Sequence, residues 1–229
     1  MFKERLIEKI RRDSLMKKEH FFYDGRIKVF IKDPLTEGVD ISYVLSKIEK
    51  LIPYNLVHNI DIVYVGYFDD LVDRDLNAKY ENGAIYLSNA QQDNDDMIDD
   101  IIHEMAHAVE EQYGRDIYGD DNITLEFAGK RSKLSRILKH QGIDITQHDF
   151  MKMEYDSDFD SLLYQEIGYP ALRSMTVNLF VSPYAATSLR EYFASGFEAY
   201  FLGNKKTLSS LSPQIYMKLT DLISEIESY

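Results

Sequence analysis

The chain has 229 residues, of which 45% are hydrophobic and 28% charged, as in an ordinary globular protein of one large domain or two fused lobes. Its 26 basic and 39 acidic residues give a formal net charge of −13, which argues against nucleic acid as a partner, because phosphate binding needs clustered cations. Cysteine is absent, so disulfides and thiolate metal sites are excluded.

The distribution of apolar residues gives no sign of a membrane protein. No long apolar run is present, and charges interrupt the apolar positions of the N-terminus, unlike in a secretory signal. We therefore expect a cytoplasmic protein with no membrane partner, and secretion by a non-classical route stays open. The acidic balance is compatible with a basic peptide substrate through long-range attraction, although it also serves solubility alone.

The first ninety residues predict a small mixed sheet with helices against it. Alternating or β-branched runs indicate strands, and an Asn-Gly pair between two short runs is a strong hairpin signal. Apolar residues spaced along one side of a segment, with an Asp before it, indicate a helix. The expected elements are a helix at 1–20, a strand at 26–32, a helix from Asp40 to about Leu51, a strand at 60–67 and a hairpin at 79–88.

After these residues the pattern becomes helical. Gly114 is expected to end the first of the later helices, because glycine is favoured directly after a helix. We therefore expect one α+β domain over 1–229, with a sheet-bearing N-terminal lobe to about 114 and a helical C-terminal lobe from about 115. The expected helices lie at 95–113, about 124–140, 158–167, 188–202 and 213–227.

The segment His103-Glu104-Met105-Ala106-His107 forms an HExxH motif inside a predicted helix. Residues four apart lie on one face of a helix, so both imidazoles can reach the same metal ion. Glu104 is expected to face the open side of that ion, where it can hold a water. This motif predicts a Zn²⁺ cofactor, whereas two surface histidines on an acidic helix are the alternative.

A catalytic zinc takes three protein ligands, and HExxH supplies two. A metzincin would need Gly and His where Glu110 and Tyr113 stand, so that subclass is excluded. Glu191 is the best third ligand, because an acid at the start of a long apolar helix is costly to bury without a cation. Glu198, seven residues later, is the alternative ligand or an acceptor for a ligand imidazole.

Two segments of the chain resemble the gluzincin zinc metallopeptidases of the anthrax lethal factor type. These are HEMAHAVE and a downstream Tyr184-x₆-Glu191-Tyr-Phe-Ala, in which the tyrosine precedes the glutamate by seven residues, as in the family. The similarity runs from about residue 60 to 225, and nothing before residue 60 resembles the toxin's receptor-binding or docking parts.

The resemblance implies a zincin-like fold, with an active-site cleft between two lobes, and a zinc-dependent endopeptidase. Such folds hold an extended substrate against an edge strand above the metal. Ala84–Ser88, with Ala84, Ile85 and Tyr86, is the expected substrate-binding strand. The implied roles are zinc binding by His103, His107 and Glu191, general base catalysis by Glu104, and stabilisation of the oxyanion by Tyr184.

Three alternatives remain open at this stage. The chain could be an inactive zincin-like protein that sequesters a basic partner, or a metal hydrolase acting on a non-peptide amide. Tyr184 could be a packing residue, since the chain has 17 tyrosines. The natural substrate and the oligomeric state do not follow from the sequence.

Overall fold

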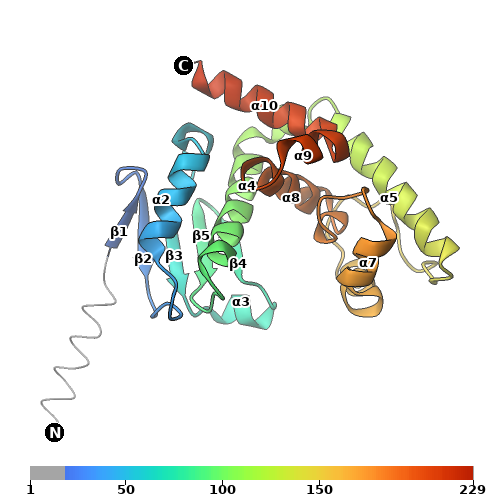
Figure 1. The fold of residues 1–229 in the computed structure, drawn as a ribbon, viewed down its shortest axis with the longest axis horizontal. Coiled ribbons are helices and arrows are strands. Elements are labelled where there is room, and N and C mark those ends of the chain that lie inside the picture. The colour runs from blue at the N-terminus through green and yellow to red at the C-terminus, as the bar shows by residue number, and fades with distance from the viewer. Residues whose placement is uncertain (1–18, 229) are drawn as a thin grey trace, which may run out of the picture. The chain divides into compact units, whose positions relative to one another are not determined.

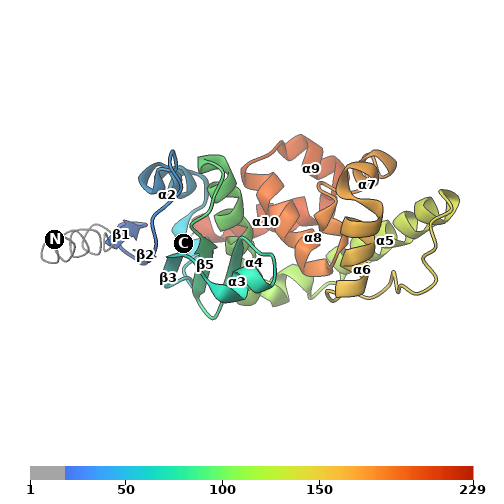
Figure 2. The same cartoon turned by 90° about the horizontal axis from the view of Figure 1, so that it is seen from below.

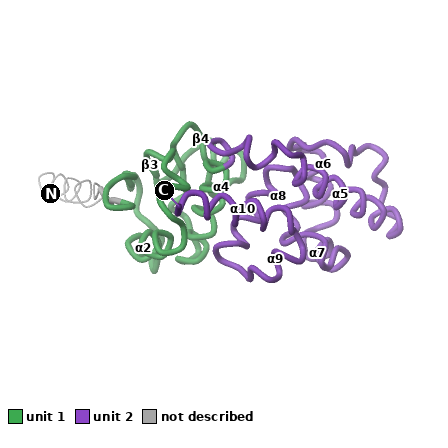
Figure 3. Tube along the Cα trace, turned by 90° about the horizontal axis from the view of Figure 1, so that it is seen from above, with its two compact units in different colours: residues 1–109 green, residues 110–229 purple. Residues whose placement is uncertain are grey.

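The computed structural model describes residues 19–228 and has a mixed α+β fold. The helix expected at 1–20 lies outside the described residues except for its last two positions, which belong to a strand. The chain divides into two compact units, residues 1–109 and 110–229, which Figure 3 colours separately. The division falls inside the helix α4 (Asn94–Tyr118), where the sequence also predicts the change from sheet to helices. Within the described range, no helix has the combined length and apolarity of a membrane-spanning segment.

Unit 1 contains a five-stranded mixed sheet with the strand order β1-β2-β3-β5-β4 (Figure 1). The pairs β2–β3 and β3–β5 are parallel, whereas β1 and β4 run antiparallel to their neighbours. The strand β5 therefore lies inside the sheet, and β4 forms an edge. The strands are β1 (Glu19–Phe22), β2 (Ile27–Ile31), β3 (Ile62–Gly66), β4 (Ala78–Glu81) and β5 (Ala84–Ser88).

The central strands bury one face of the sheet and leave the other partly exposed. Val29, Val63 and Ile85 are register partners across β2, β3 and β5, and each is at most 1% exposed. On the opposite face, the half-buried rings of Tyr64 and Tyr86 stack with centroids 5.4 Å apart. This alternation follows from the two-residue period of a strand. The helices α2 (Ile41–Leu51) and α4 contribute further buried aliphatic side chains to the core of unit 1.

The start of α2 and the hairpin confirm two local predictions. The carboxylate of Asp40 accepts hydrogen bonds from the backbone N–H groups of Ser42 (2.9 Å) and Tyr43 (3.2 Å), as expected of a residue that caps a helix. Asn82 and Gly83 join β4 to β5 with φ angles of +48° and +79°. Both central residues of a tight hairpin of this kind need positive φ, which Asn and Gly tolerate best.

The helix predicted at 95–113 ends at a kink inside the longer helix α4. Tyr113 has a non-helical backbone (φ −114°, ψ 16°), which produces a kink, but the helix resumes and continues to Tyr118. A Cβ added to Gly114 would meet nothing within 4 Å, whereas one added to Gly119 would lie 2.4 Å from the carbonyl oxygen of Arg115. The kink thus falls where the sequence predicts the helix to end, but Gly114 does not have the positive φ of a capping glycine, and the final turn of α4 ends at Gly119, where a side chain would not fit.

Unit 2 consists of helices and turns around an aromatic core that includes Phe127, Tyr192 and Phe197. α8 and α10 lie side by side in Figures 1 and 2, and a Cβ at Gly196 would lie 2.7 Å from Cγ2 of Ile215. A side chain at position 196 would thus force these helices apart. The elements are α5 (Asn122–His140), α6 (Ser157–Ser161), a π-helical segment (Leu162–Ile167), α7 (Tyr169–Met175), a 3-10 turn (Tyr184–Ala186), α8 (Leu189–Phe201), α9 (Lys205–Leu211) and α10 (Pro213–Glu227).

Of the four helices predicted after the motif helix, three are present as α5, α8 and α10, and the one at 158–167 is the short α6 followed by the π-helical segment. Several other short elements are not predictable from the periodicity. They span three to seven residues, too few to show a helical repeat. These short elements are a 3-10 turn (Tyr54–Leu56) and α3 (Asp69–Asp73) in unit 1, and α7, α9 and the turn Tyr184–Ala186 in unit 2.

Candidate metal centre

The HExxH motif lies on α4, in the part that belongs to unit 1. Glu104 and His107 are 7% and 8% exposed, and His103 is half-buried. The two imidazole rings have centroids 5.0 Å apart and planes at 80°, so they are neighbours on one side of the helix. The opposite side of α4 is fully buried and fixes the helix in the core, through Met97, Ile98, Ile101, Ile102, Met105 and Val109.

The carboxylate of Glu104 is held by the edge strand of the sheet. The backbone N–H of Tyr80 on β4 donates a hydrogen bond of 2.5 Å to Oε2 of Glu104. The N–H of Ser88 donates a hydrogen bond to the carbonyl of Asn77 (2.7 Å) just before β4. In an antiparallel pair every second residue bonds to the partner strand, so the backbone groups of Ala78 and Tyr80 point away from β5, toward the open edge of the sheet. The glutamate of the motif therefore meets the open edge of β4.

The predicted substrate-binding strand, with Ala84, Ile85 and Tyr86, is placed wrongly. These residues lie on β5, which pairs with β3 on one side and with β4 on the other. A peptide cannot add to a strand that is paired along both edges, because the backbone donors and acceptors of that strand are already engaged. The edge strand near the motif is β4.

A second segment holds Tyr184 and Glu191 in unit 2. The guanidinium of Arg131, which is 1% exposed, donates to the carbonyls of Ala186 (2.8 Å), Thr187 (3.2 Å) and Asp149 (3.1 Å). Ser188 then caps α8 by accepting a hydrogen bond from the N–H of Glu191 (3.2 Å). Arg131 thus anchors the chain between the tyrosine and the glutamate.

Tyr184 is half-buried, and burial raises the pKa of its phenol above the ordinary value, with the nearby Glu191 carboxylate adding to the effect. Its hydroxyl therefore keeps its proton at neutral pH and remains a hydrogen-bond donor. The carbonyl of Tyr184 accepts a hydrogen bond from the hydroxyl of Thr187 (2.8 Å), which stiffens the turn. Both properties suit a residue that stabilises an oxyanion.

Two acids of the motif helix, the buried Glu110 and the half-buried Asp100, were not predicted as structural groups. Glu110 is 8% exposed, accepts a hydrogen bond from the Tyr118 hydroxyl, and accepts one from Nε of Arg190 at 3.0 Å. Asp100 accepts a hydrogen bond from Nε2 of Gln91 (3.0 Å), and burial raises its pKa to about 7. In the sequence both acids look like exposed residues of an acidic helix, so nothing there distinguishes them.

One group of potential metal ligands is found among the described residues. His103, His107 and Glu191 each offer a ligand atom, and these atoms lie within 4.8 Å of one another. Two imidazole nitrogens and one carboxylate oxygen are a donor set that catalytic zinc sites use, although other divalent metals also accept it. The group includes Glu191 and not Glu198, which leaves Glu198 its predicted alternative role as an acceptor for a ligand imidazole.

Comparisons of the chain with protein-family models, with curated proteins and with solved structures found no match. The resemblance to gluzincins of the lethal factor type therefore depends on the two quoted segments and stays a prediction.

Proposed function

We propose that this chain is a zinc-dependent endopeptidase whose metal is held by His103, His107 and Glu191. The single observation that carries the proposal is the grouping of three ligand atoms within 4.8 Å, two of them from the HExxH helix. The absence of cysteine agrees with a ligand set of imidazoles and a carboxylate. When bound, zinc would supply a Lewis acid that polarises the substrate carbonyl and makes a water more acidic.

Glu104 is the proposed general base. It directly follows one proposed ligand, it is 7% exposed, and the N–H of Tyr80 holds one of its carboxylate oxygens. A carboxylate held in this way takes a proton from the attacking water and returns it to the leaving amine. A base fixed in one orientation by a backbone group loses little entropy as the reaction proceeds.

Tyr184 is the proposed donor to the oxyanion that forms when water attacks the peptide carbonyl. Its raised pKa keeps the phenol protonated, and Arg131 fixes the turn that carries it. A donor aimed at developing negative charge stabilises the transition state more than the ground state. Tyr184 therefore adds to catalysis without binding the metal.

The strand β4 is the proposed docking strand for the substrate, in place of β5. The backbone groups of Ala78 and the carbonyl of Tyr80 face the open edge of the sheet, whereas the N–H of Tyr80 is engaged by the Glu104 carboxylate. An extended peptide that adds to this edge would lie along β4 as one more strand. The negative net charge of the chain favours basic peptides at long range.

Cleavage of a random peptide library tests this proposal. The zinc-loaded protein is expected to cut internal peptide bonds, to lose this activity with a zinc chelator, and to regain it when zinc is added back. Cleavage that a chelator leaves unchanged would contradict a metal mechanism. A fully zinc-loaded protein that cuts no peptide would instead favour a hydrolase of other amides or a protein that sequesters a basic partner.

A further inference from the structure

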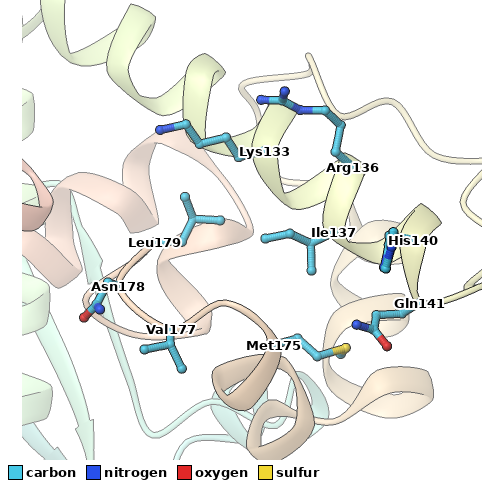
Figure 4. Close-up of a pocket in the computed structure, with 9 residues that line it drawn as sticks. All are labelled: Lys133, Arg136, Ile137, His140, Gln141, Met175, Val177, Asn178 and Leu179. Atoms are coloured by element: carbon cyan, nitrogen blue, oxygen red, sulfur yellow. The ribbon is translucent and has the colours of Figure 1, made fainter.

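Unit 2 contains an open pocket on its surface, called the cavity below, that the proposed peptidase site does not use. Its volume is about 620 Å³, within the range of about 300–1,000 Å³ that is typical of small-molecule sites. The last two turns of α5 form one wall, and the end of α7 with the segment that follows it forms the other (Figure 4). The lining residues are Lys133, Arg136, Ile137, His140, Gln141, Met175, Val177, Asn178 and Leu179.

The α5 wall carries positive charge on a chain that is strongly negative overall. Lys133, Arg136 and His140 follow one another at helical spacing, so they share one face of α5. Among the described residues that line the cavity, none is acidic. In a chain of net charge −13, a wall with two permanent cations and no acid is a local site of attraction for anions.

The remaining side chains make the cavity apolar as well as cationic. Ile137 extends from α5 toward the opposite wall, which supplies Met175, Val177 and Leu179 (Figure 4). Val177 is 68% exposed and lies beside the other apolar side chains of the cavity, so it adds accessible apolar surface to them. A simple inorganic anion would gain nothing from these four side chains.

The wall opposite α5 is held in place by hydrogen bonds and is not a loose loop. The buried ammonium of Lys130, one turn before Lys133, donates to the carbonyl of Leu179 and to that of Leu211 (2.6 Å). Leu179 N–H also donates to the carbonyl of Thr176 (3.0 Å). Because α5 itself fixes the facing wall, the cavity is formed before any ligand binds, which reduces the entropic cost of binding.

We propose that this cavity binds a small amphiphilic anion: one phosphate or carboxylate group on an aromatic or aliphatic body. The anionic group pairs with Lys133 and Arg136, and the apolar body lies against Ile137, Met175 and Leu179. Asn178 and Gln141 offer amide groups to polar atoms of the ligand at the rim. The site stands apart from the peptidase proposal, and neither depends on the other.

Titration of the full-length protein with 1-naphthyl phosphate tests the site. Calorimetry is expected to show saturable binding of one molecule per chain, at least tenfold tighter than that of neutral 1-naphthol or of inorganic phosphate. In protein labelled with ¹³C at the methionine methyls, the Met175 resonance should shift, whereas that of Met217 on α10 should not. Equal binding of naphthol, or a shift confined to methionines outside the cavity, would overturn the proposal.

Two variants of α5 make the test specific to the cavity. Arg136→Gln removes a lining cation and is expected to weaken binding of 1-naphthyl phosphate about fivefold. Lys139→Gln removes the same charge from an exposed position of the same helix that does not line the cavity, and should leave the affinity unchanged. Both positions are exposed, so neither substitution threatens the fold. Equal effects of the two substitutions would show general attraction of anions and overturn the assignment.

A phosphate on an apolar body could belong to a free metabolite or to a lipid, and a sedimentation assay separates these sources. Vesicles containing phosphatidic acid should sediment the wild-type protein, and not Arg136→Gln, if the natural ligand is a lipid headgroup. If the site is made for free small anions, the vesicles leave the protein in solution while 1-naphthyl phosphate still binds.

Discussion

The backbone N–H of Tyr80 donates a hydrogen bond of 2.5 Å to Oε2 of Glu104, which joins the edge strand of the sheet to the glutamate of the HExxH motif. The N–H of Tyr80 points to the open edge of the sheet because the residues on either side of it in β4 make the backbone hydrogen bonds to β5. One backbone position therefore orients the proposed general base and lies on the strand proposed to receive the substrate.

Replacing Tyr80 separates these contributions. Tyr80→Pro removes the N–H without breaking the β4–β5 ladder, because proline is tolerated on an edge strand where the N–H points away from the partner. Tyr80→Ala also loses the side chain but keeps the donor. With the Ala variant as reference, the Pro variant is expected to show a kcat about tenfold lower, since one hydrogen bond to a charged group is lost. Equal kcat values in steady-state peptide cleavage would show that the N–H does not orient Glu104.

The two glutamates of α8 should differ in their effect on metal binding. Glu191→Gln removes a proposed ligand and is expected to lower zinc affinity by more than about 100-fold, whereas Glu198→Gln should lower it about tenfold at most. Competition with a fluorescent zinc chelator measures both affinities. If Glu198→Gln lost more zinc affinity than Glu191→Gln, Glu198 would be the metal ligand in place of Glu191.

Arg131 is expected to contribute strongly to stability. Its guanidinium is 1% exposed, donates to three carbonyls, and lies 3.8 Å from the centroid of the Phe159 ring. Arg131→Met leaves the buried carbonyls of Ala186 and Thr187 and the partly buried carbonyl of Asp149 without their donor, so the free energy of unfolding should fall by about 3 kcal/mol. Arg136→Met, at an exposed position of the same helix, should change it by less than about 0.5 kcal/mol. Urea denaturation of both variants checks the difference, and similar losses would contradict the anchoring role.

Lys130 should give stability a dependence on pH. Burial lowers its pKa from 10.5 to about 8, against the attraction of Glu126 and with repulsion from Lys133 adding to the shift. Between these two values the native state binds fewer protons at Lys130 than the unfolded state does, so the contribution of this residue to stability rises with pH and is smallest below about pH 8.

The comparison with Lys130→Met isolates this effect. Between pH 7 and 10 the wild-type protein should gain about 2 kcal/mol of unfolding free energy relative to the variant. Urea denaturation across this range measures the difference. A constant difference between the two proteins would mean that Lys130 keeps its ordinary pKa when folded.

Local signals in the sequence predict much of unit 1. The Asn82-Gly83 pair gives the hairpin, and Asp40 gives the start of α2, because each depends on a few neighbouring residues. The order of strands does not have this local origin. The parallel pairing of β3 with β5 places β5 inside the sheet, and no residue pattern within β4 or β5 predicts this pairing. The choice of β5 as the edge strand was wrong for that reason.

Other parts of the candidate site depend on contacts between distant segments. The spacing in HExxH predicts that His103 and His107 share one side of a helix, and their rings are neighbours there. Arg131 reads as an ordinary cation of an amphipathic helix, and only the folded chain shows that it holds the turn before α8. The cavity beside α5 could not be predicted from the sequence either, because its second wall lies about forty residues further along the chain.

Peptide cleavage by Glu104→Gln, compared with Glu111→Gln on the same helix and with the wild-type protein, tests the central claim most directly. Each protein is first shown to carry one zinc per chain. The proposal predicts that Glu104→Gln binds zinc as the wild type does but cleaves at least about 10³-fold more slowly, while Glu111→Gln keeps full activity. Cleavage at the wild-type rate by zinc-loaded Glu104→Gln would contradict the proposed mechanism.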